Sequence, residues 1–220
     1  MPVKLMLVFL LVFLSFGTLV HSQGTVLVDN FENELSGTWK AKSFHNETIY
    51  EVVLENGSHV LQATSSGSAS GLIYEHEYDV NEYPILSWRW KIEDTVEGGD
   101  YRQKMSDDFA ARIYVTFPHW FFPKTTSLNY IWANQMPRDE IHPNAYTGNA
   151  MMIAVESGKE KVRKWVESRR NIVEDYRLAF GEDPPGKAVI AIMTDTDNTG
   201  KKARAWYDDI YLMKSESERK

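Results

Sequence analysis

Apolar and polar side chains alternate along most of the chain between Gly24 and Met213. A period of two is typical of β-strands, because successive side chains of a strand point to opposite faces. The candidate strands are TVLVDNF, TIYEVVLE, HVLQAT, GLIYEHEY, PILSWRWKI, DFAARIYVTF, SLNYIWA, NAMMIAV, AVIAIM and ARAWYDDIYL. Asn56-Gly57, between the second and third of them, is a strong hairpin signal. Many short strands separated by turn-rich loops predict an all-β fold, a two-sheet antiparallel sandwich of the jelly-roll type.

One segment breaks the period of two and predicts a short helix over residues 172–180. Asn171 stands at the N-cap position with Glu174 three residues later, an arrangement that satisfies free backbone N–H groups. Gly181 follows the last apolar residue of the segment, and Pro184–Pro185 prevent the helix from continuing. The helix is too short to be stable alone, so it must pack on the sheets.

The chain divides into three parts. A positive charge at Lys4 precedes an apolar stretch, and small residues follow it, which is the pattern of a signal peptide over residues 1–22. The alternative is an uncleaved anchor, although the apolar stretch is short for a membrane span. Residues 23–213 are expected to form one β-sandwich domain, with a charged tail at 214–220. Because the chain has no cysteine, it has no lipobox and no disulfide, and a periplasmic or secreted location is predicted.

Composition narrows the range of partners. The chain contains 24 Lys and Arg against 31 Asp and Glu, and loss of the leader would remove one lysine and no acid. This acidic balance argues against nucleic acid or an anionic membrane as the main partner. Aromatic residues make up 13% of the chain, enough both for sandwich cores and for surfaces that stack on sugars. The sequence does not indicate an oligomeric state.

The alternation within the central strands suggests a binding face. In PILSWRWKI, Arg89 and Lys91 lie opposite Trp88 and Trp90, which are expected in the core. If neighbouring strands pair, one face gathers cations and aromatic rings that suit a glycan or another small polar ligand, including an anionic one. The residues expected to contact it are Arg89, Lys91, Arg112, Tyr114, Tyr130 and Trp132. The alternative is that these cations are ordinary solvated side chains.

Two acidic segments could add to this face. Asp195 and Asp197 alternate in DTDNTG, as in a calcium loop, but Trp206 stands where an EF-hand requires a bidentate glutamate. The simplest interpretation is a hairpin loop between AVIAIM and ARAWYDDIYL, with a looser cation or ligand site as the alternative. Asp107 and Asp108 are a carboxylate pair that could contact a ligand or perform acid–base chemistry.

A separate calcium site is expected where the chain ends meet. Asp29 and Glu32 lie in the region of the first strand, and Asp208 and Asp209 lie in the last. First and last strands of a sandwich often lie side by side, and clustered carboxylates need a cation or raised pKa values. These acids therefore predict a structural Ca²⁺ that clamps the termini.

Several long segments resemble one family of exported bacterial proteins, Domain of Unknown Function 3047. They are SWRWKI, DDFAARIYVTF, LNYIWA, YTGNAMMIAVESG, RRNIVEDYRLAFGEDPP and AIMTDTDNTGKKARAWYDDIYL. The resemblance implies a single compact domain behind a signal peptide, and it supplies no activity or catalytic residues. More distantly, VDNFE and YDDIYL resemble the two ends of galactose-binding-like jelly rolls, which bind glycans and often hold a structural calcium near their termini.

Three functions follow from these observations. The first is a non-catalytic periplasmic or secreted module that binds a carbohydrate or another polyhydroxylated ligand. The second is a polysaccharide lyase or glycoside hydrolase on the same scaffold, using Asp107, Asp108 or Asp195 with Arg112. The third is a structural or interaction protein of the envelope, which would use the aromatic segment at His119–Phe122.

Overall fold

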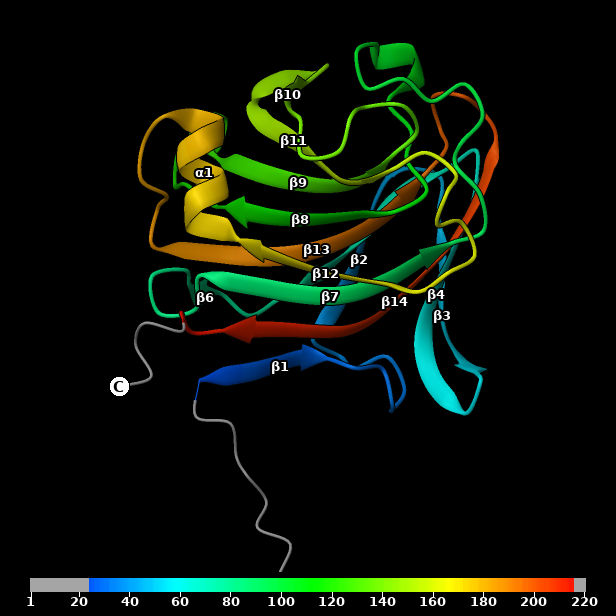
Figure 1. Ribbon diagram of the computed structural model, residues 1–220, viewed down its shortest axis with the longest axis horizontal. Coiled ribbons are helices and arrows are strands. Elements are labelled where there is room, and N and C mark those ends of the chain that lie inside the picture. The colour runs from blue at the N-terminus through cyan, green and yellow to red at the C-terminus, as the bar shows by residue number, and fades with distance from the viewer. Residues whose placement is uncertain (1–23, 216–220) are drawn as a thin grey trace, which may run out of the picture.

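The computed structural model describes residues 24–215, and the predicted leader at 1–22 lies outside them, as do residues 216–220 of the tail. Fourteen strands form two sheets that pack face to face (Figure 1). This confirms the prediction of a two-sheet all-β sandwich with one short α-helix. No helix in the described residues is both long enough and apolar enough to cross a membrane.

Sheet A has six strands in the order β12-β7-β14-β4-β3, with β1 also paired to β14. Its strands are β1 (Thr25–Asp29), β3 (Ile49–Glu55), β4 (Ser58–Ser66), β7 (Ile85–Ile92), β12 (Val166–Asn171) and β14 (Lys202–Met213). The hairpin predicted at Asn56-Gly57 joins β3 to β4, and both residues have the positive φ that this turn requires, 52° and 94°. The first and last strands lie side by side as expected.

Sheet B has eight strands in the order β10-β11-β9-β8-β13-β5-β2, with β6 also paired to β13. Its strands are β2 (Trp39–His45), β5 (Ala69–Tyr74), β6 (Tyr78–Asp79), β8 (Arg112–Phe117), β9 (Thr126–Ala133), β10 (Ile141–Asn144), β11 (Thr147–Ser157) and β13 (Lys187–Asp195). Two short 3₁₀ helices, η1 (Lys104–Ser106) and η2 (Phe122–Lys124), lie in its loops. Among the described strands, β9 and β11 are the one parallel pair.

The helix α1 (Ile172–Phe180) confirms its predicted start and end. The Asn171 side chain accepts hydrogen bonds from the backbone N–H groups of Val173 and Glu174, and Gly181 adopts the left-handed conformation that ends the helix. Ile172 and Tyr176 are buried. In Figure 1 the helix stands at one end of the sandwich, where it contacts β12 of sheet A and β9 of sheet B.

Aromatic side chains fill the space between the sheets. Trp88 and Trp90 are buried there, as predicted, and their rings meet those of Tyr130 and Trp132 at centroid distances of 5.4 and 5.9 Å. Such contacts add to the stability that the burial of apolar area provides. The proposal that Tyr130 and Trp132 stack on a ligand is wrong, because they are 0% and 1% exposed. Their strand was assigned the correct alternation, but its aromatic face points into the core.

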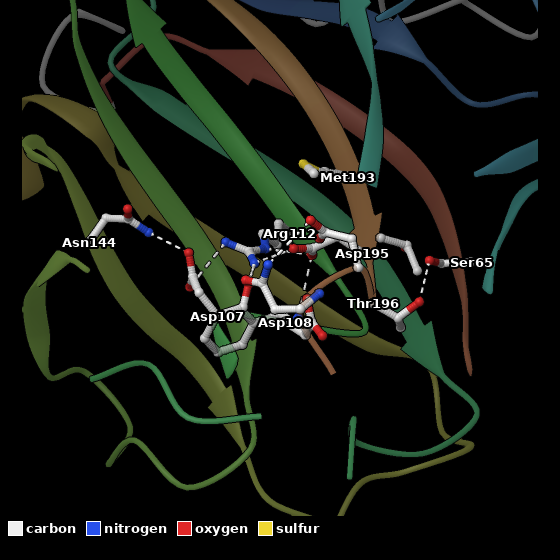
Figure 2. A network of polar contacts seen from close by, with 12 residues as sticks. Ser65, Asp107, Asp108, Arg112, Asn144, Met193, Asp195 and Thr196 are labelled. Atoms are coloured by element: carbon white, nitrogen blue, oxygen red, sulfur yellow. Dashed lines mark hydrogen bonds and ion pairs between the residues drawn. The ribbon is translucent and has the colours of Figure 1, made fainter. Parts of the chain in front are cut away.

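The acidic segment after β13 does not form a hairpin. β13 pairs with β5, β6 and β8 of sheet B, whereas β14 pairs with β1, β4 and β7 of sheet A. Residues 196–201 therefore cross from one sheet to the other. Buried Thr196 holds this crossing in place, because its hydroxyl is 2.7 Å from that of Ser65 on β4 (Figure 2).

Candidate functional site

The outer face of sheet B contains a groove of about 560 Å³. Its floor is hollow because small residues, Gly71, Ala150 and Ala191, occupy outward positions of three strands. The rim carries larger side chains from the two edges of the sheet and from one loop. These are Lys42 and Phe44 on β2, Phe122 in η2, and Asn144 and Tyr146 at the end of the β10–β11 hairpin.

An ion pair between Arg112 on β8 and Asp195 at the end of β13 lies at one end of the groove (Figure 2). Nε and Nη2 of Arg112 bind the two carboxylate oxygens of Asp195 at 2.7 and 2.5 Å. Nη2 also donates to the backbone carbonyl of Asp107. Both charged side chains are buried, so this two-pronged geometry offsets the cost of removing two charges from water.

Burial changes the acidity of this pair. The pKa of Asp195 is raised to about 7, mainly by burial and also by the nearby carboxylates of Asp108 and Asp107, while Arg112 acts in the opposite direction. Burial would lower the pKa of Arg112, but Asp195, Tyr114 and Asp107 raise it well above its ordinary value. Arg112 therefore stays charged, and Asp195 is the member of the pair that titrates near neutral pH.

Tyr114 and Asp107 are polar groove residues that lie next to this ion pair. The Tyr114 hydroxyl is 3.4 Å from Nη1 of Arg112, and burial raises the pKa of Tyr114 to about 12. Asp107 accepts a hydrogen bond of 2.8 Å from the Asn144 side chain through Oδ2. Its Oδ1 is buried, has no hydrogen-bond partner among the described residues and lies 3.6 Å from Nη1 of Arg112.

The crossing segment brings a third carboxylate to Asp108 and Asp195. One oxygen from each of Asp108, Asp195 and Asp197 lies within 4.8 Å of the others, so the triad could hold a metal ion. Asp108 also accepts hydrogen bonds from the backbone N–H groups of Asn198 and Thr199 at 3.2 and 2.6 Å. Burial and Asp108 raise the pKa of Asp197.

Two predicted contact residues lie elsewhere. Arg89 and Lys91 are on β7 of sheet A, so the expectation that they share a face with Arg112 and Tyr114 is wrong. Arg89 forms ion pairs of 2.6 and 3.2 Å with Asp208 and Asp209. Lys91 is paired with Glu55, and its ammonium group lies 4.1 and 5.2 Å from the ring centroids of Trp206 and Trp165. These contacts form a packed cluster on the outer face of sheet A.

The structure does not gather the four acids expected at the chain ends. Asp208 and Asp209 pair with Arg89, while Asp29 accepts hydrogen bonds from the Phe31 backbone and the Trp39 indole. Glu32 lies 3.5 Å from His59. Within residues 24–215, the acids Asp108, Asp195 and Asp197 are the one group close enough to share a metal.

Several groove residues are absent from the sequence-based set. Asn129 on β9 points outward, whereas the sequence-based set included only the aromatic side chains of this strand. A polar residue within an otherwise apolar strand was the signal that could have identified it. Asn144 and Tyr146 lie in a segment that was assigned to a loop, and β10 is too short to give a clear alternation. Phe44 belongs to β2, which was not among the candidate strands. All residues of β2 after Trp39 are exposed, so the strand lacks a clear alternation of buried and exposed residues.

The fold is similar to the β-sandwiches of carbohydrate-binding modules. A family 30 carbohydrate-binding module of the cellulosomal cellulase Cel9D-Cel44B of Clostridium thermocellum superposes with a TM-score of 0.51 and 10% identity, over 87% of this chain and 98% of that chain. The family 11 module of Lic26A-Cel5E from the same organism gives 0.43 and 12%, over 87% and 95%. The CBM22-1 xylan-binding domain of Paenibacillus barcinonensis Xyn10C gives 0.40 and 13%, over 87% and 97%.

Sequence comparison identifies the family of the chain. Residues 37–211 match the family described as protein of unknown function, DUF3047, and the chain belongs to that family. No curated protein matches the sequence. The recognition made from the sequence segments is thus confirmed, while the ligand must be argued from the groove.

Proposed function

We propose that this protein is an exported, non-catalytic binding protein that holds a carbohydrate or another polyhydroxylated ligand in the groove of sheet B. The observation that carries the proposal is the groove itself, about 560 Å³ in volume, with an aromatic rim and a floor that combines small side chains with polar ones. Sugars are bound in this way, through ring stacking on their C–H faces and hydrogen bonds to their hydroxyls. The carbohydrate-binding modules that share the fold are consistent with this choice of ligand.

The aromatic loop at His119–Phe122 supports the same proposal. Trp120 is 92% exposed, and its ring lies 5.9 Å from that of Phe121. Phe122 is also exposed and lines the groove. Large exposed rings mark contact surfaces. Because Phe122 lines the groove and Trp120 and Phe121 precede it directly in the chain, a glycan chain that extends beyond the groove is the simplest partner.

The acids of the groove are engaged in ways that favour binding over catalysis. Both oxygens of Asp195 bind Arg112, and both oxygens of Asp108 bind backbone N–H groups. A general acid or base needs a free oxygen within reach of the substrate. Of the acids assigned to the hydrolase or lyase alternative, Asp107 is the one that keeps a carboxylate oxygen without a hydrogen bond.

The test is isothermal titration with cellohexaose, xylohexaose, mannohexaose and hexagalacturonate, combined with chromatography of the products. We expect at least one oligosaccharide to bind without cleavage, and Phe122→Ala to weaken its binding about tenfold, the equivalent of 1.4 kcal/mol. Trp206→Ala, on the outer face of sheet A, is the matched control and should bind as wild type does. Release of shortened or unsaturated products would instead favour the enzyme. An absence of binding, together with cross-linking of the His119–Phe122 loop to an envelope protein, would favour the third function.

Calcium is the ion we propose for the acid triad, because carboxylate oxygens are the ligands that Ca²⁺ prefers. The bound ion would lower the raised pKa values of Asp195 and Asp197 by stabilising their charged forms. Millimolar Ca²⁺ should raise the melting temperature by a few degrees, and Asp197→Asn should abolish this rise. Asp209→Asn is the control for the calcium site expected at the chain ends. A melting temperature that is unchanged by Ca²⁺ and by a chelator would exclude the metal.

Export is proposed from the N-terminal sequence. Fractionation of the native host should place the protein outside the cytoplasm with its N-terminus at Gln23, and mass spectrometry of the mature chain tests both points.

A further inference from the structure

Asn129 holds an unusual position on the floor of the groove. It lies in the interior of β9, opposite Tyr114 on β8 and Met152 on β11. Its side chain is 1% exposed, and neither its Oδ1 nor its Nδ2 has a hydrogen-bond partner among the described residues. Asparagine is disfavoured in strand interiors, and a buried amide without partners destabilises the folded state. Stability alone therefore gives no reason for an asparagine here.

A second buried atom without a hydrogen bond belongs to the same groove, although it lies 3.6 Å from Nη1 of Arg112. Oδ1 of Asp107 is buried without a hydrogen bond, while Oδ2 of the same carboxylate is held by Asn144. Asn144 also lies 3.8 Å from the sulfur of Met152, the cross-strand neighbour of Asn129. Tyr114, which faces Asn129 across the strands, places its hydroxyl 3.4 Å from Arg112. Asp107, Tyr114, Asn129 and Asn144 thus line the groove together.

The Arg112 guanidinium in the groove already binds other groups of the protein. Every nitrogen of the Arg112 guanidinium has a partner, since Nε and Nη2 bind Asp195, Nη2 binds the Asp107 carbonyl, and Nη1 contacts Tyr114. No planar fork is left for the carboxylate of an acidic sugar. Lys42, the other cation lining the groove, is on β2 at the edge of the sheet, where its ammonium group lies 5.4 Å from the Phe44 ring centroid.

We propose that Asn129, with Asp107 and Tyr114, recognises two adjacent hydroxyls on a neutral sugar ring. This inference rests on the proposed function and names the class of saccharide. A primary amide donates and accepts at once, so one hydroxyl can accept from Nδ2 while its neighbour donates to Oδ1. Asp107 Oδ1 accepts from a hydroxyl in the same way. A ligand carboxylate can only accept, and it would meet the negative charge of Asp107, so uronic acids are disfavoured. Because the amide is covered in the free protein, the ligand must displace a neighbouring side chain to reach it.

The test separates a binding role from a structural one. Asn129→Leu keeps the side-chain size and removes the unpartnered amide, so the melting temperature should stay the same or rise by a few degrees. In the same variant, the affinity for the neutral hexasaccharide that wild type binds best should fall at least tenfold. A residue that only supports the fold would give the opposite pattern, a loss of stability with unchanged affinity. Gln62→Leu, which makes a similar amide-to-leucine change on β4 of sheet A outside the groove, is the matched control and should bind as wild type does.

A second arm changes the ligand as well as the protein. In monodeoxygenated forms of the same neutral saccharide, one hydroxyl is removed at a time. Removal at one pair of adjacent positions should lower the affinity of wild type about as much as Asn129→Leu does. The same removals should not lower the affinity of the variant any further. The inference is overturned if Asn129→Leu binds as wild type, or if hexagalacturonate binds wild type at least as tightly as the neutral chains. In both cases the proposed function survives. If wild type binds none of the four hexasaccharides, both proposals fail.

Discussion

The outer faces of the two sheets carry similar residues and have different structures. On sheet A, Arg89 and Lys91 are covered by acids and by the rings of Trp165 and Trp206, and the surface is filled. On sheet B, Arg112 and Tyr114 stand beside alanines and a glycine, and the surface is hollow. Cations and aromatic rings therefore do not by themselves indicate a binding site. A site also needs small neighbouring residues and polar atoms that the fold leaves without partners.

The largest difference between the two faces should appear when one acid is removed from each ion pair. Asp195→Ala leaves Arg112 charged in a buried position, which should destabilise the protein by about 3–5 kcal/mol at about pH 8, where Asp195 is ionised. Urea denaturation measures this loss. The double variant Arg112→Met/Asp195→Leu should recover much of the stability, because no unpaired charge remains. If the double variant is less stable than Asp195→Ala, desolvation of the charge is not the cause.

The buried pair of Arg112 and Asp195 should also make stability depend on pH below neutrality. Because the pKa of Asp195 is raised to about 7 in the folded protein, the folded state binds more protons than the unfolded state between about pH 4 and pH 7. The contribution of Asp195 to stability is therefore complete at the acidic end and decreases as the pH rises. Melting temperatures should fall by several degrees between about pH 5 and pH 7.5. Asp195→Asn should flatten this dependence, and an equally steep fall in the variant would assign it to another group.

A larger side chain in the groove should make the outer face of sheet B as filled as that of sheet A, and so unable to bind a ligand. Ala191→Leu places a larger side chain into the groove from an outward position of β13. We expect the affinity for the preferred oligosaccharide to fall more than tenfold with little change in melting temperature, because the core is not altered. Calorimetric titration and a thermal scan of the same sample measure both. Unchanged affinity would mean that the ligand binds elsewhere.

The smallest effect is expected on the outer face of sheet A. Arg204 on β14 pairs with Glu93, and the two side chains are 42% and 50% exposed; pairs of this kind usually contribute up to about 1 kcal/mol. Arg204→Ala should therefore lower the melting temperature by about 2–4 °C at most, and saccharide affinity should be unchanged. A large loss of affinity would show that this face takes part in binding and would remove the distinction between the two sheets.

The alternation of side chains predicted much of the fold but not the pairing of strands between sheets. Leu86 and Trp88 point inward and Arg89 outward, as expected from a period of two. The same period cannot show that β7 and β8 belong to different sheets, because a loop as long as residues 93–111 can connect strands in either layer. Arg89 and Lys91 were therefore grouped with Arg112 although they lie on opposite sides of the molecule.

The candidate site was predicted only in part, because alternation identifies outward polar residues but not their three-dimensional contacts. Arg112, Tyr114, Asp107, Asp195 and Asp197 line the groove, because they are polar residues at outward positions or at strand ends. Asn129 was not among the predicted contact residues, because its lack of hydrogen-bond partners depends on three-dimensional contacts that no spacing encodes. Asp108 meets Asp195 and Asp197 because the chain crosses between sheets, which the hairpin interpretation did not include.

The parallel pairing of β9 with β11 has a consequence for how this family can diversify. Two parallel neighbours cannot be joined by a tight turn, so the chain must make a detour between them, and here that detour carries β10, Asn144 and Tyr146 along one side of the groove. Residues inserted into or deleted from this excursion would reshape the mouth of the site while the layers beneath stay intact. Related proteins could in this way change what the groove accommodates by altering a single loop.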